Sequence, residues 1–284
     1  MGRQTGEPCK IKLRDVFLNL EKPAVMGVLN LTPDSFYDGG KYLADDRAIG
    51  QIDKMVAEGA SIIDIGGEST RPGSDPVPVE IEMNRVIPLL KHAVREFPGT
   101  LFSVDTTKYE VAKEALESGV HIINDVSGLR KEPGFAELCT QYHAGYVLMH
   151  SIATPKTMQN APVYKNIVAE METFFRNGIS KLIETGVKSI ILDPGFGFGK
   201  TLAHNLELVK EMHSFLKLGY PVLAGASRKS MIGAVLNGRA SEGRLAGTIA
   251  LHYHCLVNGA RILRVHDVKE AADSIEIFNA VMNQ

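Results

Sequence analysis

The sequence predicts an α/β chain that folds as a (β/α)₈ TIM barrel with a short N-terminal extension. Eight short apolar runs rich in β-branched residues recur along the 284 residues, and a segment with helical spacing of its apolar residues follows each run. Strands buried on both faces have this composition, and eight strand–helix units are the number that closes such a barrel. A doubly wound open sheet is the alternative, because it shows the same alternation.

The predicted strands and helices follow one another in strict order. The strands are expected at Ala24–Leu29, Ser61–Ile65, Leu101–Val104, Ile122–Asn124, Tyr146–Met149, Ile190–Leu192, Val222–Ala224 and Ile262–Val265. The helices are expected at Asp45–Glu58, Val79–Phe97, Tyr109–Leu116, Phe135–Tyr142, Val168–Ile183, Leu206–Leu216, Leu245–Val257 and Lys269–Met282. Five helices have a glycine just past their end, where a left-handed residue is favoured, namely Gly59, Gly119, Gly186, Gly219 and Gly259.

No linker or low-complexity segment divides the chain. We therefore expect residues 1–22 to form an N-terminal cap and residues 23–284 to form a single barrel domain. The weakest part of the pattern is the stretch 150–165, which is expected to be a long mobile loop.

The composition is that of an ordinary globular protein, with 44% hydrophobic residues, 23% charged residues and a net charge of −2. The near-zero charge argues against general binding to nucleic acid or to membrane surfaces. Residues 1–20 lack a signal-peptide pattern, and no run approaches the roughly 18 apolar residues of a membrane span. Three cysteines lie far apart, which indicates reduced thiols and a cytoplasmic protein.

Polar and charged residues gather where each predicted strand ends, which is the end of a barrel that carries the chemistry. The eight segments are Asn30–Phe36, Gly66–Gly73, Asp105–Thr106, Asn124–Asp125, Met149–His150, Asp193–Lys200, Ser227–Ser230 and Arg264–Asp267. Each alone is an ordinary cap or turn, but eight at one rim indicate a ligand site.

The rim divides into acceptors and cations. Asp105, Asn124 and Asp193 are suited to the donor edge of a planar heterocycle, which a carboxylate accepts through two parallel hydrogen bonds. A metal is the alternative, but the first strand lacks the His-x-His of many metal-dependent barrel hydrolases. The cations, which suit phosphate groups, are Arg71, Arg228, Lys229, Arg264 and His266.

One segment invites a different interpretation. Gly195–Thr201 resembles a nucleotide-binding phosphate loop, but Pro194 stands where that motif needs a glycine. The glycines instead favour a tight turn beside a bound ring, with Phe198 available for stacking. His150, taken alone, is more often structural than catalytic.

Seven segments in this order resemble the dihydropteroate synthase family, over about residues 24–282. They are Asn30–Asp34 with Phe36, Gly66–Gly73, Ser103–Thr106, Asn124–Val126, Asp193–Lys200, Ser227–Lys229 and Arg264–Asp267. The resemblance implies a transferase of folate biosynthesis that condenses 6-hydroxymethyl-7,8-dihydropterin diphosphate with 4-aminobenzoate, giving 7,8-dihydropteroate and diphosphate.

The resemblance also implies a role for individual residues. The implied pterin pocket consists of Asp105, Asn124, Asp193, Lys229, Met149 and Phe198. The implied diphosphate site consists of Thr70, Arg71, Arg264 and His266, with Asn30 as a ligand of a Mg²⁺ cofactor. The implied 4-aminobenzoate site consists of Phe36, Pro72, Arg228, Lys229 and Ser230. The implied catalytic residues are Asp34, Lys229, Arg264 and His266.

The implied mechanism is dissociative. Diphosphate leaves once its charge is neutralised, and the cation left on the pterin methylene is stabilised by Asp34 and captured by the amine. Loops 30–41 and 67–78 are expected to be mobile and to order over the substrates, which excludes water. The resemblance further implies a homodimer and competition by sulfonamides at the 4-aminobenzoate site.

Some positions depart from the family pattern, namely Tyr37, Thr107 and the run Ser151-Ile152-Ala153. The rival functions are a corrinoid-dependent methyltetrahydrofolate methyltransferase, a non-catalytic pterin binder, and a barrel hydrolase or aldolase in which Lys229 forms a Schiff base. The methyltransferase has no diphosphate to hold, so the cationic set argues against it.

Overall fold

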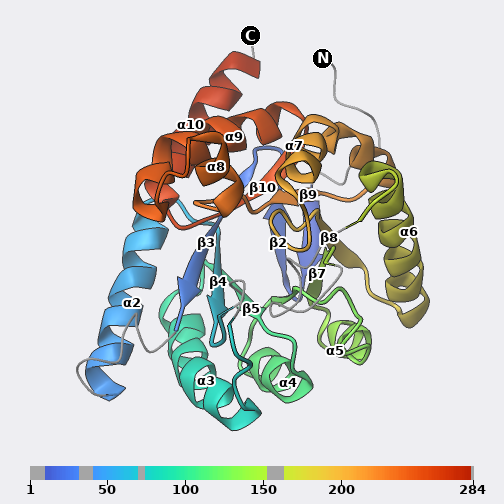
Figure 1. Ribbon diagram of the computed structural model, residues 1–284. Helices are drawn as coiled ribbons and strands as arrows, with labels where there is room; N and C mark the ends of the chain where they lie inside the picture. The colour runs from blue at the N-terminus through green and yellow to red at the C-terminus, as the bar shows by residue number, and fades with distance from the viewer. Residues whose placement is uncertain (1–9, 32–40, 70–73, 152–162, 283–284) are drawn as a thin grey trace.

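The computed structural model describes residues 10–31, 41–69, 74–151 and 163–282, apart from the side chains of residues 41–44. Eight parallel strands close into a barrel in the order β10-β3-β4-β5-β6-β7-β8-β9, and helices surround it (Figure 1). The predicted TIM barrel is thus confirmed, and the open-sheet alternative is wrong because β10 pairs with β3 along Ile262–Val265.

Strands and helices alternate as the sequence predicts. The barrel strands are β3 (Ala24–Asn30), β4 (Ile62–Gly66), β5 (Leu101–Asp105), β6 (Ile122–Asp125), β7 (Gly145–Met149), β8 (Ser189–Asp193), β9 (Val222–Ala224) and β10 (Ala260–Val265). The helices are α2 (Lys41–Ala57), α3 (Val79–Glu96), α4 (Tyr109–Glu117), α5 (Phe135–Tyr142), α6 (Ile167–Thr185), α7 (Leu202–Lys210), α8 (Ser230–Val235), α9 (Leu245–Val257) and α10 (Val268–Met282). All five predicted helix-ending glycines have positive φ.

The single helix predicted over Leu206–Leu216 is wrong. Helix α7 begins earlier because Thr201 caps it, with a reciprocal capping box to His204. After Glu211 the chain tightens into the 3₁₀ helix η1 (Met212–Leu218). The short helix α8 and the 3₁₀ helix η2 (Ser241–Arg244) follow β9 and were not predicted.

The interior of the barrel has an apolar layer and a polar layer. Ile62, Ile122, Ile191 and Ile262 belong to one buried apolar cluster at the N-terminal ends of the strands. Side chains on one face of a strand recur every second residue. Two residues further along, these four strands place Asp64, Asn124, Asp193 and Arg264 on the inner face, one layer closer to the C-terminal ends. The switch from apolar to polar residues therefore marks where the packed core ends and a ligand site begins.

A β-hairpin closes the apolar end of the barrel. It consists of β1 (Lys10–Leu13) and β2 (Val16–Asn19), and its buried Ile11, Leu13 and Leu18 join the apolar cluster inside the barrel. The Arg14 amide donates to the His143 carbonyl at 2.7 Å. Gly145 makes room for the hairpin, because a Cβ there would lie 2.5 Å from Leu13 Cδ2. The domain boundary after residue 22 stays a prediction.

Truncating the buried hairpin leucine is expected to destabilise the protein. Leu13→Ala should lower the free energy of unfolding by about 2–3 kcal/mol, because a fully buried leucine leaves a cavity. Phe17→Ala is the matched control, since Phe17 lies on the same hairpin but is 62% exposed. Urea unfolding measures both. Equal losses would show that the hairpin does not plug the barrel.

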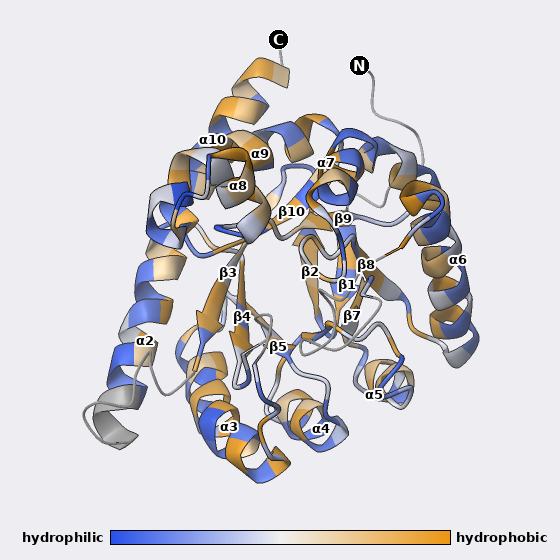
Figure 2. Cartoon of the chain, in the orientation of Figure 1, coloured by the Kyte–Doolittle hydropathy of each residue, from blue (hydrophilic) through white to orange (hydrophobic). Residues whose placement is uncertain are grey.

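Hydrophobic residues dominate the strands and alternate with hydrophilic ones on the surrounding helices (Figure 2). Helix α3 is an example, since Val86, Leu89, Leu90 and Ala93 are buried while Glu80 and Arg95 begin and end the helix with charge. None of the helices in the described ranges is long and apolar enough to cross a membrane.

Candidate active site

Two carboxylates share one guanidinium at the polar end of the barrel. Arg264 on β10 donates from Nε to Asp64 Oδ2 and from Nη2 to Asp105 Oδ2, each at 2.7 Å. Asn124 Nδ2 donates to the same Asp64 oxygen at 2.9 Å. This bond fixes the orientation of the amide, so that Asn124 Oδ1 remains the end that can accept from a ligand.

Burial shifts the pKa values of the charged groups in this cluster. Asp64 is fully buried, Asp105 is nearly so, and burial raises the pKa of Asp105 to about 7. Arg264 opposes this rise and the charge on Asp64 adds to it. Burial disfavours the charge on Arg264, but Asp64 and Asp105 outweigh it and raise the pKa of the guanidinium. One cation therefore holds two acids that would otherwise repel each other.

A second charged pair lies across the barrel. Burial raises the pKa of Asp193, with the Lys229 charge opposing it. Burial lowers the pKa of Lys229 to about 8, with Asp193 opposing it. Lys229 Nζ donates to the Phe196 carbonyl and lies 4.6 Å from the centroid of the Phe198 ring. An acceptor, a donor and an aromatic face thus meet at one place, as a planar heterocycle requires.

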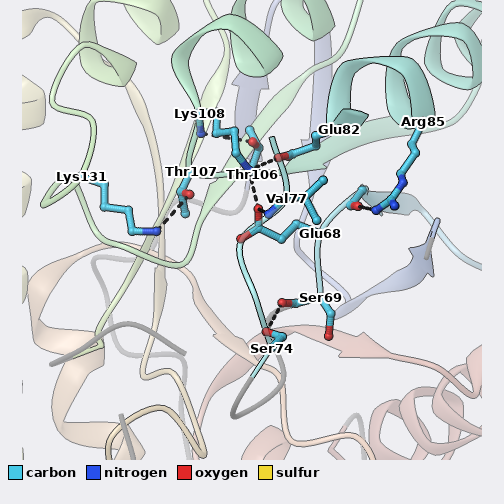
Figure 3. Close-up of polar contacts among 11 residues, drawn as sticks. Glu68, Ser69, Ser74, Val77, Glu82, Arg85, Thr106, Thr107, Lys108 and Lys131 are labelled. Atoms are coloured by element: carbon cyan, nitrogen blue, oxygen red, sulfur yellow. Dashed lines mark hydrogen bonds and ion pairs between the residues drawn. The ribbon is translucent and has the colours of Figure 1, made fainter. Parts of the chain in front are cut away.

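The segment after β4 is held by a buried cluster of charges. Figure 3 shows Lys108, from the segment after β5, between Glu68 and the fully buried Glu82, and Lys108 forms ion pairs with both. Glu68 also accepts from the Val77 amide at 3.0 Å. Ser74 Oγ donates to the Ser69 carbonyl. These bonds hold the two chain ends that flank residues 70–73.

The chain resembles known proteins over most of its length. A family model for pterin binding enzymes matches residues 26–266. The dihydropteroate synthase of Haemophilus influenzae is 42% identical over 276 residues, which cover 96% of this chain and 99% of the relative. The chain belongs to the dihydropteroate synthase family.

Solved structures of the family agree with this assignment. A Yersinia pestis dihydropteroate synthase in a sulfonamide complex superposes with a TM-score of 0.90 at 39% identity, covering 97% of this chain and all of that one. The Xanthomonas albilineans enzyme with 4-aminobenzoic acid also gives 0.90 at 39% identity, with 97% and 99% coverage. The same enzyme with 7,8-dihydropteroate gives 0.87 at 38% identity, with 97% and 99% coverage.

The structure brings many of the residues expected from the family to the same end of the barrel. Those in described ranges are Asn30, Asp105, Asn124, Met149, Asp193, Phe198, Arg228, Lys229, Ser230, Arg264 and His266. His266 Nδ1 lies 3.0 Å from Ser227 Oγ. Asp34, Phe36, Thr70, Arg71 and Pro72 lie outside the described residues, as do Tyr37, Ile152, Ala153 and much of the loops predicted to be mobile.

Arg228 has contacts that the sequence did not reveal. Its guanidinium makes two bonds to Asp267, at 2.8 and 2.7 Å, and two more to the carbonyls of Ser241 and Glu242. Its backbone adopts the left-handed conformation, with φ of 54°, and its amide donates to Thr248 Oγ1. Arg228 therefore fixes the turn that carries Lys229 and Ser230.

Asp64 was not among the site residues predicted from the sequence. It is the central member of the Arg264 cluster, and its Oδ1 has no hydrogen-bond partner among the described residues. The available signal was a carboxylate in the middle of the apolar run Ser61–Ile65, on the inward-facing register. A charged residue in a strand that is buried on both faces requires a partner. The position of Asp64 in the sequence therefore indicated a buried ion pair.

Acid should destabilise the protein partly through His252. This ring is 2% exposed, its Nε2 accepts from the Ala226 amide, and burial lowers its pKa from 6.5 to about 4. The unfolded chain then binds the proton first, so stability is lost as pH falls from about 6.5 toward 4.

His252→Gln keeps an acceptor but removes this titration. Its loss of unfolding free energy between pH 6.5 and 5.5 is expected to be about 1 kcal/mol smaller than that of the parent. Urea unfolding at a series of pH values measures the difference. Above about pH 7.5 the two curves should run parallel, and identical slopes below pH 6.5 would contradict the assignment.

Proposed function

We propose that this chain condenses 6-hydroxymethyl-7,8-dihydropterin diphosphate with 4-aminobenzoate in folate biosynthesis. The observation that carries the proposal is the charge pair of Asp193 and Lys229, at the same end of a packed barrel core as the Asn124 amide. Asp193 supplies acceptors for the aminopyrimidine edge, Lys229 donates to the ring carbonyl and ring nitrogen, and Asn124 Oδ1 accepts a further donor. Met149 and Phe198 line the two faces of the ring.

Asp105 links the proposed pterin site to the proposed diphosphate site. Its carboxylate faces the pterin and is tied to Arg264, so the pterin site and the diphosphate site share a residue pair. Arg264 and His266 neutralise charge that develops on the departing diphosphate, together with Thr70 and Arg71. Asp34 stabilises the cation on the pterin methylene, which 4-aminobenzoate then captures.

A divalent cation fits the end of β3. Asn30 offers an amide oxygen, the hard donor that Mg²⁺ prefers. The neighbouring Gly66 carries no side chain, and a Cβ there would lie 3.6 Å from Asn30 Oδ1 and 3.4 Å from Asp105 Cβ. Both distances are ordinary van der Waals contacts, so the support for the ion is the oxygen donor that Asn30 offers at this end of the barrel. When bound, Mg²⁺ supplies positive charge to the leaving diphosphate.

The second substrate is assigned to the turn after β9. Arg228, Lys229 and the first residue of α8, Ser230, border 4-aminobenzoate. The family resemblance adds Phe36 and Pro72, which lie outside the described residues. A cationic rim suits the carboxylate of this substrate. Sulfonamides, which share its shape and its aromatic amine, compete for the same place.

Purified protein tests the proposal directly. Diphosphate release from the dihydropterin diphosphate is measured in Mg²⁺ with and without 4-aminobenzoate. Release that depends on 4-aminobenzoate and yields dihydropteroate is expected. Tight pterin binding without release would favour the methyltransferase or a non-catalytic binder. Activity that resists a high sulfonamide concentration at limiting 4-aminobenzoate would overturn the competition.

We further infer a homodimer in the cytoplasm. Val257 on α9 and Ile277 and Val281 on the adjacent α10 are half exposed or more, which provides apolar surface for a second copy. Cys139 and Cys255 are buried and unpaired, as in a reducing compartment. Sedimentation at several concentrations tests the dimer, and Ile277→Glu should weaken it.

A further inference from the structure

The glycine-rich turn after β8 encloses a buried ammonium group. Lys200 is 3% exposed, and its Nζ donates to the carbonyl oxygens of His150, Gly195 and Phe198 at 3.1, 2.9 and 3.0 Å. An ammonium has three N–H donors, so all three are used. The lysine that made this segment resemble a phosphate loop therefore binds carbonyl groups of its own turn and of the residue after β7.

Burial removes this cation from water at a cost in free energy, which indicates that the buried charge has a structural role. Three carbonyl dipoles replace water around Nζ, and the bonds that the structure describes join it to no carboxylate. Burial lowers the pKa of Lys200 to about 7, with Asp193 opposing it. An apolar side chain would fill the same volume without that penalty, but it would remove this donor from all three carbonyls, of which the Gly195 carbonyl keeps a second donor, the Phe198 amide.

The turn that Lys200 holds presents three groups to the Asp193–Lys229 pair. The Gly195 amide donates to Asp193 Oδ1 at 2.7 Å, and the Phe196 carbonyl accepts from Lys229. The Phe198 ring lies against Lys229.

The backbone of this turn offers little rigidity of its own. Gly195, Gly197 and Gly199 all have positive φ, between 63° and 81°. Glycine is the residue that loses most conformational freedom on folding, so a turn with three of them needs an anchor. Its approach to β7 is also close, because a Cβ on Gly195 would lie 2.2 Å from the His150 carbonyl oxygen.

We propose that Lys200 is a positioning residue, a built-in cation that joins the end of β7 to the 195–200 turn and so sets Asp193, Lys229 and Phe198 for the pterin ring. This role rests on the proposed function, because it acts through the pterin pocket. It requires the charged amine, since only an ammonium supplies all three donors.

The first experiment measures binding of a phosphate-free dihydropterin to Lys200→Ala, roughly one pH unit below the lysine pKa. The dissociation constant is expected to rise about tenfold or more, because Asp193 and Lys229 lose the turn that holds them against the edge of the ring. Two controls accompany it. Leu13→Ala loses stability far from the site, and Lys210→Met removes a lysine whose side chain is 80% exposed; both should bind like the parent.

Chemical rescue separates the cation from the space it fills. In Lys200→Ala the missing atoms correspond to propylammonium, which supplies three donors, whereas 1-propanol has similar bulk and one donor. Propylammonium should restore most of the lost affinity and 1-propanol little. Equal rescue by both, or an unchanged dissociation constant in Lys200→Ala, would overturn the proposal.

A measurement on the unmodified lysine covers the case in which Lys200→Ala fails to fold. In protein labelled with ¹⁵N at lysine Nζ, buried ammonium signals exchange slowly. Lys108 and Lys229 are the other shielded lysines of the site, so the signal that survives in both Lys108→Met and Lys229→Met is that of Lys200. This signal should shift when the dihydropterin binds to the parent protein, and no shift would contradict the coupling. If the parent bound no pterin at all, the proposed function would fail, and this role with it.

Discussion

Asp193→Asn is expected to weaken binding of the dihydropterin by about 1.5–3 kcal/mol, or roughly ten- to a hundredfold in the dissociation constant. Asp193 Oδ1 already accepts from the Gly195 amide, so Oδ2 is the oxygen left to accept from the ligand. Asparagine keeps one acceptor and adds a donor, which meets either the Gly195 N–H or the donor edge of the ring. One of these contacts becomes repulsive in every orientation.

Titration calorimetry with a phosphate-free dihydropterin measures this effect without the diphosphate contacts. The matched control is Asp273→Asn, the same substitution at a side chain on α10 that is 61% exposed, which should bind normally. Thermal unfolding of Asp193→Asn checks that the fold survives. A dissociation constant within twofold of the parent would remove Asp193 from the pterin pocket.

Arg264→Met is expected to lower the free energy of unfolding by about 3–5 kcal/mol, because it leaves the buried Asp64 and Asp105 without their common partner. Methionine fills much of the volume, so the loss reports charge rather than a cavity. Pterin affinity should fall as well, since Asp105 no longer has a fixed position. The family resemblance implied Arg264 as a residue of the diphosphate site and not of the pterin pocket.

Urea unfolding measures the loss, and two further variants sharpen the test. Arg176→Met removes an arginine of an exposed i,i+4 pair and should change stability by less than about 1 kcal/mol. Adding Asp64→Asn to Arg264→Met removes one of the two stranded charges, so part of the lost stability should return. A double variant less stable than Arg264→Met would contradict the ion-pair argument.

The apolar periodicity determined the barrel. Eight strand runs, seven of the eight helices and five helix-ending glycines were correct because each depends on residues within one or two turns of each other. The alternation along a strand also carried the polar rim, since Ile191 and Asp193, or Ile262 and Arg264, are neighbours on one face. The α7–η1 break escaped because capping by Thr201 outweighed the apolar spacing of the following residues.

The partners of the site residues were decided by the tertiary structure. Asp64 and Arg264 are 200 residues apart, and they meet because β10 closes the barrel against β3, next to β4. Pro194 already argued against a phosphate loop at Gly195–Thr201, but only the fold placed the His150 carbonyl 3.1 Å from the Lys200 ammonium. The sequence by itself determined which residues reach the rim, because strand periodicity is local. Only barrel closure decided which charges neutralise each other, because a buried charge takes the partner that the fold brings within hydrogen-bond distance.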